Sequence, residues 1–121
     1  MENKKKQIEE AESLMQPGYF HHAVSRYGAL GMKEKAKEAS LKCAVDCLQN
    51  YRPAFAIKYL RKAGKEDIAS EVEGICKAHY FTPKEDLEMR ACAMGLCSSY
   101  VDGAMTVSES KEVKSLIDNL K

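Results

Sequence analysis

With 121 residues, the chain is long enough to bury the core of one domain without disulfide or metal cross-links. Hydrophobic residues make up 45% of it and charged residues 31%, a balance that excludes wholesale disorder. The net charge is only +1, and no uncharged stretch approaches the roughly 20 residues that span a bilayer. We therefore expect a single domain, residues 1–121, that does not enter a membrane.

The first half of the chain shows helical periodicity interrupted by turn residues, with no strand-like alternation. The sequence QPG at 16–18 ends a first helix, and Gly31 ends a second. The sequence NYRP at 50–53 separates a third helix from a fourth, because proline suits the first helical turn, and Gly64 follows the fourth. The predicted helices extend to residue 15 and over 19–30, 32–49 and 53–63.

The second half contains the clearest amphipathic helix, which starts at Lys65. Its apolar face is formed by Ile68, Ala69, Val72, Ile75, Cys76 and His79.

Thr82 is a predicted N-cap, followed by Pro83 and by Glu85 in capping-box position, for a helix that continues to about residue 101. The pair Asp102-Gly103 should end that helix, and Ser108 should cap a last one. Seven helices without a linker predict an all-α domain.

The sequence repeats itself with a shift of 33 residues. Identical residues pair as Ala23/Ala56, Gly31/Gly64, Ala36/Ala69, Glu38/Glu71 and Cys43/Cys76. Small alanines let helices approach closely, and glycine turns the chain. A period of this length is typical of stacked helix-turn-helix units.

The two units resemble the tetratricopeptide repeat, and they are similar to the helical repeats of clathrin- and coatomer-type trafficking proteins. The shared pattern of large residue, glycine and alanine occurs as Tyr27, Gly31, Ala36 and again as Leu60, Gly64, Ala69. The resemblance covers about residues 19–80 and departs from the family in its spacing, which is usually about 34. It implies antiparallel helix pairs stacked as a short α-solenoid, with the first helix of each pair lining a concave groove. Residues 83–120 could then supply a third pair.

Cys43 and Cys47 are one helical turn apart, as are Cys76 and His79, and four such ligands can hold zinc. However, Cys43 and Cys76 share one repeat position, where a small packing residue is expected, so we interpret them as core residues. Cys92 and Cys97 point about 140° apart on a helix and are a weaker pair. We predict no metal and no cofactor.

No residue pattern argues for catalysis, because the sequence lacks a recognised signature for a cysteine nucleophile, a phosphate-binding loop or a zinc hydrolase. The neighbouring His21 and His22 begin a helix, where we expect one at the surface and the other in the core. We predict a non-enzymatic protein. With no apolar signal segment in the first residues, MENKKKQIEEAE, and five cysteines that suit a reducing compartment, we expect it in the cytoplasm.

The most informative surface feature lies between residues 51 and 65, where no acidic residue occurs. Four cations at i, i+3, i+4 and i+7 share one helix face, with an arginine and a tyrosine just upstream. This basic stripe consists of Tyr51, Arg52, Lys58, Arg61, Lys62 and Lys65. The family resemblance implies that Lys58 and Arg61 face the groove, where an acidic segment or a C-terminal carboxylate is the matching ligand.

The expected function is therefore a protein–protein interaction or scaffolding module, within a larger assembly, that binds an acidic segment of its partner. One alternative is RNA binding, with Tyr51 or Tyr59 stacking on a base, although RNA-binding domains usually carry a strongly basic net charge. Another is head-to-tail self-association, since residues 1–65 hold 13 Lys/Arg against 7 Asp/Glu and residues 66–121 hold 6 against 11. The stripe can also be an ordinary solvated helix face.

Overall fold

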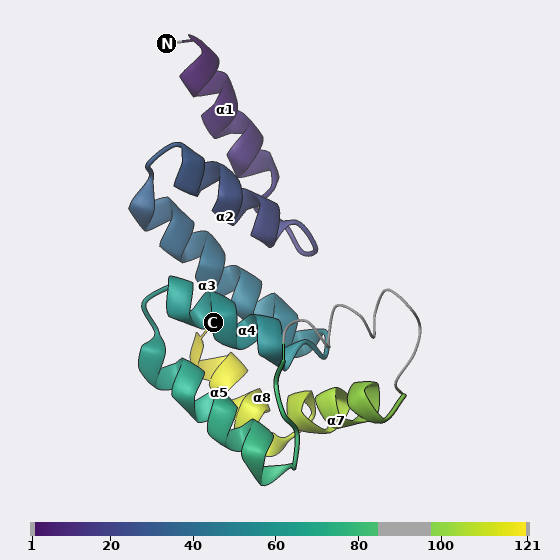
Figure 1. Ribbon diagram of the computed structural model, residues 1–121. Helices are drawn as coiled ribbons and strands as arrows, with labels where there is room; N and C mark the ends of the chain where they lie inside the picture. Colours follow the sequence, from purple (N-terminus) through teal and green to yellow (C-terminus); the bar gives the residue numbers. More distant parts are fainter. Residues whose placement is uncertain (1, 85–97, 121) are drawn as a thin grey trace.

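The computed structural model describes residues 2–84 and 98–120, with the side chains of residues 3–84 and 102–120. All regular structure in these ranges is helical and contains no strand (Figure 1). The helices are α1 (Glu2–Ser13), α2 (Phe20–Ala29), α3 (Lys33–Gln49), α4 (Pro53–Lys62), α5 (Glu66–Ala78), α7 (Ser98–Ser108) and α8 (Lys111–Leu120). The all-α prediction is confirmed, and the bounds of the first five helices agree closely with those predicted.

Helices α1 to α5 stack in chain order, each packing on the one before it and reversing direction (Figure 1). The tightest neighbours are α2 with α3 and α3 with α4, so the central helix α3 is covered on two sides. This arrangement is a small solenoid-like stack. No helix of residues 2–84 and 98–120 is long and apolar enough to cross a bilayer.

Four of the helix ends in this stack have the same geometry. The residue after the C-cap has a positive φ at each: Gly31 (72°), Tyr51 (63°), Gly64 (78°) and Tyr80 (55°). The next backbone N–H then donates to a carbonyl five residues earlier, as Met32 does to Tyr27 and Phe81 does to Cys76. Glycine normally takes this position, so the two tyrosines adopt a costly backbone conformation.

The 33-residue repeat holds at the starts of α3 and α5, Lys33 and Glu66, but not at their ends. Helix α3 has 17 residues and α5 has 13, so α3 carries one additional turn, residues 46–49. This turn has no counterpart in the second unit. It lies where α3 meets the first turn of α4.

The core consists of two groups of buried side chains. The smaller lies between α1, α2 and α3 and includes Ala11, Ala23 and Tyr27; the larger joins α3, α4, α5, α7 and α8. Tyr59 packs against both groups. The apolar face predicted for residues 68–79 is confirmed, since its members are buried or half-buried. Cys43 and Cys76 are also buried, as predicted for packing residues.

The predicted helix end at Asp102-Gly103 is wrong, because α7 continues through both residues to Ser108. Gly103 instead permits a close approach: a Cβ there would lie 2.9 Å from Cδ2 of the Phe81 ring. The predicted helix start is also wrong at its first residue, since Pro83 lies outside any helix. Lys84 is not helical either, whereas residues 98–101 are helical as predicted, as the start of α7. Residues 85–97, including Glu85, fall outside the described residues.

Ser108 does not cap the last helix either. It ends α7, is 5% exposed, and its Oγ has no hydrogen-bond partner among the described residues. The cap of α8 is Ser110, whose Oγ accepts a hydrogen bond from the Val113 N–H at 3.3 Å.

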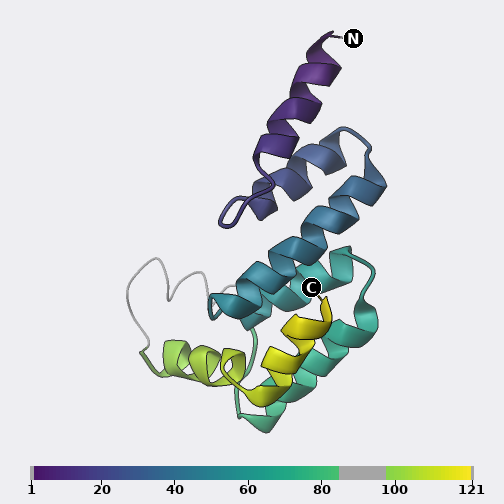
Figure 2. The same ribbon diagram turned by 180° about the vertical axis from the view of Figure 1, so that it is seen from behind.

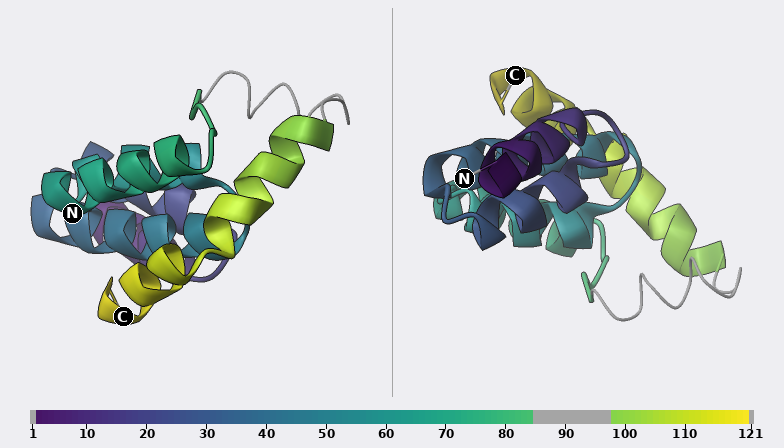
Figure 3. Two further views of the ribbon diagram at one scale, coloured as in Figure 1. Left: turned by 90° about the horizontal axis from the view of Figure 1, so that it is seen from below. Right: turned by 90° about the horizontal axis from the view of Figure 1, so that it is seen from above.

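The last two helices do not simply extend the stack. Helix α8 lies behind it, against α3 and α5 (Figure 2). Helix α7 contacts α4 and projects away from the stack at an angle (Figure 3). The face of α3 and α5 that opposes α8 is therefore covered.

Candidate partner-binding site

A pocket of about 750 Å³ lies between the beginning of α2, the end of α3 and the first turns of α4. We call it the α3–α4 pocket. It is lined by Pro17, Gly18, His21, Cys43, Asp46, Cys47, Asn50, Arg52, Phe55 and Tyr59. The additional turn of α3 supplies Asp46 and Cys47 to this pocket, and α4 of the second unit supplies Phe55 and Tyr59.

Asp46 holds the rim of this pocket together. One carboxylate oxygen accepts a hydrogen bond from the Gly18 N–H at 3.1 Å, and the other accepts one from Asn50 Nδ2 at 2.9 Å. Asp46 thereby connects the α1–α2 turn to the end of α3. It is the only carboxylate among the pocket-lining residues, and it is already hydrogen-bonded at both oxygens.

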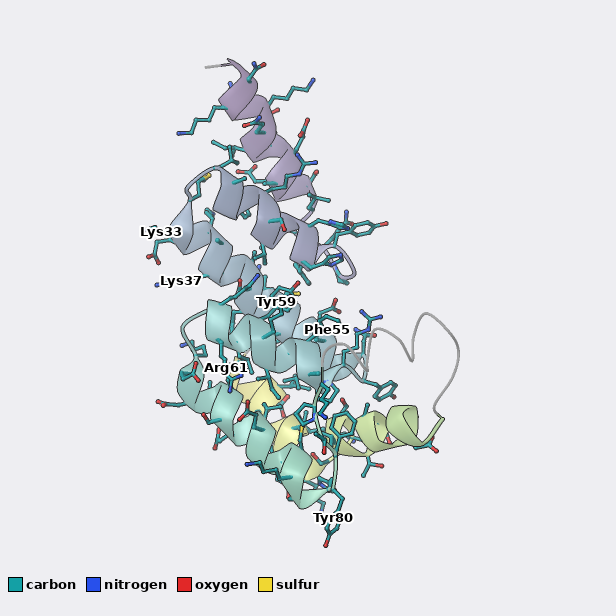
Figure 4. The ribbon with its side chains drawn as sticks, in the orientation of Figure 1. Lys33, Lys37, Phe55, Tyr59, Arg61 and Tyr80 are labelled. Carbon is teal, nitrogen blue, oxygen red and sulfur yellow. The ribbon has the colours of Figure 1, made fainter. Side chains whose placement is uncertain are left out.

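Three cations stand over two aromatic rings of α4. The Arg52 guanidinium lies 5.5 Å from the centroid of Phe55, and the amino groups of Lys58 and Lys62 lie 5.7 and 5.5 Å from the centroid of Tyr59. Figure 4 shows Phe55 and Tyr59 on this helix. Such contacts orient positive charge over an apolar surface. The wall of the pocket is therefore both aromatic and basic.

The positive potential extends to His21 at the start of α2. Burial lowers the pKa of His21 most, and the positive charges of His22 and Arg52 lower it further, while Asp46 opposes them. The rings of His21 and His22 lie 4.0 Å apart, tilted by 39°. Both histidines are exposed, so the expectation that one enters the core is wrong: the buried face of α2 begins at Ala23.

At the floor of the pocket, Cys43 and Cys47 lie one turn apart on α3. A hydrogen bond from Cys47 is the main cause that lowers the pKa of the Cys43 thiol, and the charges of Lys62 and Lys58 add to it. Burial and Asp46 act in the opposite direction. The two lysines are therefore close enough to influence the Cys43 sulfur.

The structure divides the predicted basic stripe. Arg52 lines the α3–α4 pocket, and Lys58 and Lys62 lie over the ring of Tyr59, which lines it too. Arg61 instead turns toward α5 (Figure 4). There its Nε pairs with Glu66 at 3.1 Å, and its other arm pairs with Glu73.

The remaining two members of the stripe also lie elsewhere. Tyr51 donates a hydrogen bond from its hydroxyl to Glu109 at 3.1 Å. Lys65 precedes α5 and lines a different, shallower hollow together with Lys35 and Lys37.

The zinc ligand set considered from the sequence is not assembled. No three His, Cys, Asp or Glu side chains within the described ranges come together in a way that could hold a metal ion. Cys76 is part of the larger core, and His79 is half-buried at the end of α5.

Sequence reasoning missed His21, Asp46 and Phe55 as pocket residues. The available signal was the length of α3: its additional turn lies outside the 33-residue match and carries Asp46. No protein-family model, curated protein or solved structure matches this chain.

Proposed function

We infer that this protein is a non-catalytic binding module, working in the cytoplasm as part of a larger assembly, and that the α3–α4 pocket receives an acidic segment of a protein partner. The observation that carries the proposal is the concentration of Arg52, Lys58 and Lys62 over Phe55 and Tyr59 beside a pocket of about 750 Å³. A carboxylate pairs with the cations while an adjacent apolar side chain enters the pocket.

The distribution of acidic groups supports an anionic ligand. Asp46 is the one carboxylate in the lining, and its oxygens already accept hydrogen bonds from Gly18 and Asn50. Helix stacks of the tetratricopeptide type, which the sequence resembles, use such surfaces for peptides. A local hollow of about 750 Å³ favours a side chain on a peptide over a nucleic-acid backbone, which needs a continuous basic track.

The test measures binding of a fluorescein-labelled peptide of alternating glutamate and leucine by fluorescence anisotropy. A glutamine–leucine peptide of equal length and a labelled poly(U) oligonucleotide are measured in parallel. The glutamate peptide should bind more tightly than both, and the variant K58E/K62E should lose about tenfold in affinity for it, equal to about 1.4 kcal/mol.

The matched control is K33E/K111E, which changes the net charge equally. Lys33 and Lys111 are the first residues of α3 and α8, where a negative charge suits the helix dipole. Figure 4 shows Lys33 at the far end of α3 from Phe55. If both double variants lose affinity equally, binding follows overall charge and the pocket is not the site. Tighter binding of poly(U) than of the glutamate peptide would favour the RNA alternative.

A further inference from the structure

The two sulfur atoms in the α3–α4 pocket differ from the third described cysteine in access. Cys47 is half-buried and Cys43 is 4% exposed, and both line the pocket. Cys76 is fully buried among apolar side chains of the larger core. Of the three described cysteines, Cys43 and Cys47 are therefore the two that a reagent can approach through a surface pocket without unfolding of the stack.

The surroundings of this pair favour a sulfur anion. Cys47 donates a hydrogen bond to Cys43, and the amino groups of Lys62 and Lys58 on α4 reinforce the effect on the pKa of Cys43, which is lowered. Burial and the charge of Asp46 on α3 oppose this lowering, and His21 on α2 lines the same pocket. The thiolate is the reactive form of cysteine, and these contacts favour it at Cys43, beside the more accessible Cys47.

We propose that Cys47 is a modification site that forms a mixed disulfide with anionic low-molecular-weight disulfides, with Cys43 as the acceptor of its proton. Cys43 begins as the thiolate. It takes the proton of Cys47 along their hydrogen bond, and the Cys47 sulfur attacks one sulfur of the disulfide. The old S–S bond breaks as the new one forms, and the other half leaves as a thiolate that is protonated by water.

The helix prevents the alternative product, an internal disulfide. Side chains four residues apart on a helix have Cβ atoms about 5–6 Å apart, whereas a disulfide needs about 3.5–4.5 Å. Closing a Cys43–Cys47 bond would require α3 to bend within the turn that also holds Asp46. The mixed disulfide therefore persists until an external thiol removes it.

The charge of the pocket selects the reagent. Arg52 lines the pocket beside Phe55, and Lys58 and Lys62 lie over the ring of Tyr59, which also lines it. Glutathione disulfide carries carboxylates at both ends, so the cations raise its local concentration, whereas they do nothing for a neutral disulfide. This inference concerns the chemistry of the sulfur atoms and does not depend on the proposed partner.

The experiment exposes the reduced full chain to glutathione disulfide and locates adducts by peptide fragmentation in a mass spectrometer. We expect the adduct on Cys47, with Cys76 in the same sample as the internal control that stays unmodified until urea is added. The variant C47S should lose the adduct. The variant C43S should form it several-fold more slowly at neutral pH, with the rate profile displaced to higher pH.

A second measurement tests whether the lysines beside the pocket favour an anionic disulfide over a neutral one. K58E/K62E should slow the reaction with glutathione disulfide several-fold while changing the rate with hydroxyethyl disulfide, a neutral reagent, by much less. Circular dichroism checks that each variant is folded. The proposal is overturned if native protein is modified at Cys76 before Cys47, or if C43S leaves the rate and the pH profile of modification unchanged. It is also overturned if K58E/K62E slows the reactions with both disulfides equally.

Discussion

Gly103 lies against the ring of Phe81, so closely that a Cβ at position 103 would stand 2.9 Å from the ring's Cδ2. Phe81 is 6% exposed and belongs to the larger core, so its ring has little room to move. We expect G103A to lower the free energy of unfolding by about 1–3 kcal/mol, as overpacking does, despite alanine's better helix propensity. Urea unfolding followed by circular dichroism measures the change.

Gly74 provides the matched control for this prediction. It lies inside α5, is exposed, and has nothing within 4 Å of an added Cβ. G74A should therefore raise the free energy of unfolding by about 0.5–1 kcal/mol. A gain of similar size in both variants would show that the Phe81–Gly103 contact does not constrain position 103.

The tyrosines at the ends of α3 and α5 make a second matched pair. Tyr80 has a φ of 55° and is 98% exposed, pointing away from the stack (Figure 4). Because glycine adopts this conformation without steric cost, Y80G should stabilise the protein by about 0.5–1 kcal/mol. Y51G should gain less, since it also loses the hydrogen bond from Tyr51 to Glu109. A larger gain at position 51, measured by thermal unfolding, would contradict this explanation.

The His21 imidazole gives a prediction for pH. Its pKa lies below the ordinary 6.5 because of burial and the charges of His22 and Arg52. The unfolded chain then binds a proton to His21 at a higher pH than the folded chain does. The contribution of His21 to the free energy of unfolding is therefore fully present above pH 6.5, the ordinary pKa, and is lost as the pH falls through the lower pKa of the folded state. NMR titration should show a higher pKa for His21 in R52Q and a lower one in D46N. Unchanged titration in both would mean that neither charge acts on His21.

How far the sequence predicts this fold depends on what kind of residue marks each boundary. Proline and glycine fixed the turns around α2 to α5 because their effect is local. At Asp102-Gly103 the same rule failed, because Gly103 does not mark a turn: it leaves room for the ring of Phe81, a residue distant in sequence. The serine cap was misplaced by two residues because Ser108 and Ser110 are alike locally, and only Ser110 has its Oγ near the Val113 N–H.

The candidate site shows the same division between local and distant information. Spacing along α4 correctly placed Lys58 and Lys62 on one side of the helix, near the same ring. It could not show that Glu66 and Glu73 approach Arg61 from α5, because no periodicity reports the packing of one helix's charges against another's. Nor could it show that the additional turn of α3 brings Asp46 to Gly18.

Arg61 therefore gives the sharpest test of how the basic stripe is divided. Its guanidinium pairs with Glu66 and Glu73 on α5, and all three side chains are substantially exposed, so R61Q should lower the free energy of unfolding by at most about 1 kcal/mol. The loss should shrink at high salt, because salt screens exposed ion pairs.

Binding separates Arg61 from the lysines on the same helix. Because Arg61 neutralises two carboxylates, R61Q should weaken binding of the glutamate–leucine peptide less than K58Q/K62Q does. The affinity of each variant is measured by anisotropy at the same ionic strength. R61Q also leaves Glu66 and Glu73 without their cation, so any small effect it has on the peptide arises from their repulsion and disappears in R61Q/E66Q/E73Q. If affinity stays low in that triple variant, Arg61 itself contacts the ligand, and the stripe works as the single surface that its spacing predicts.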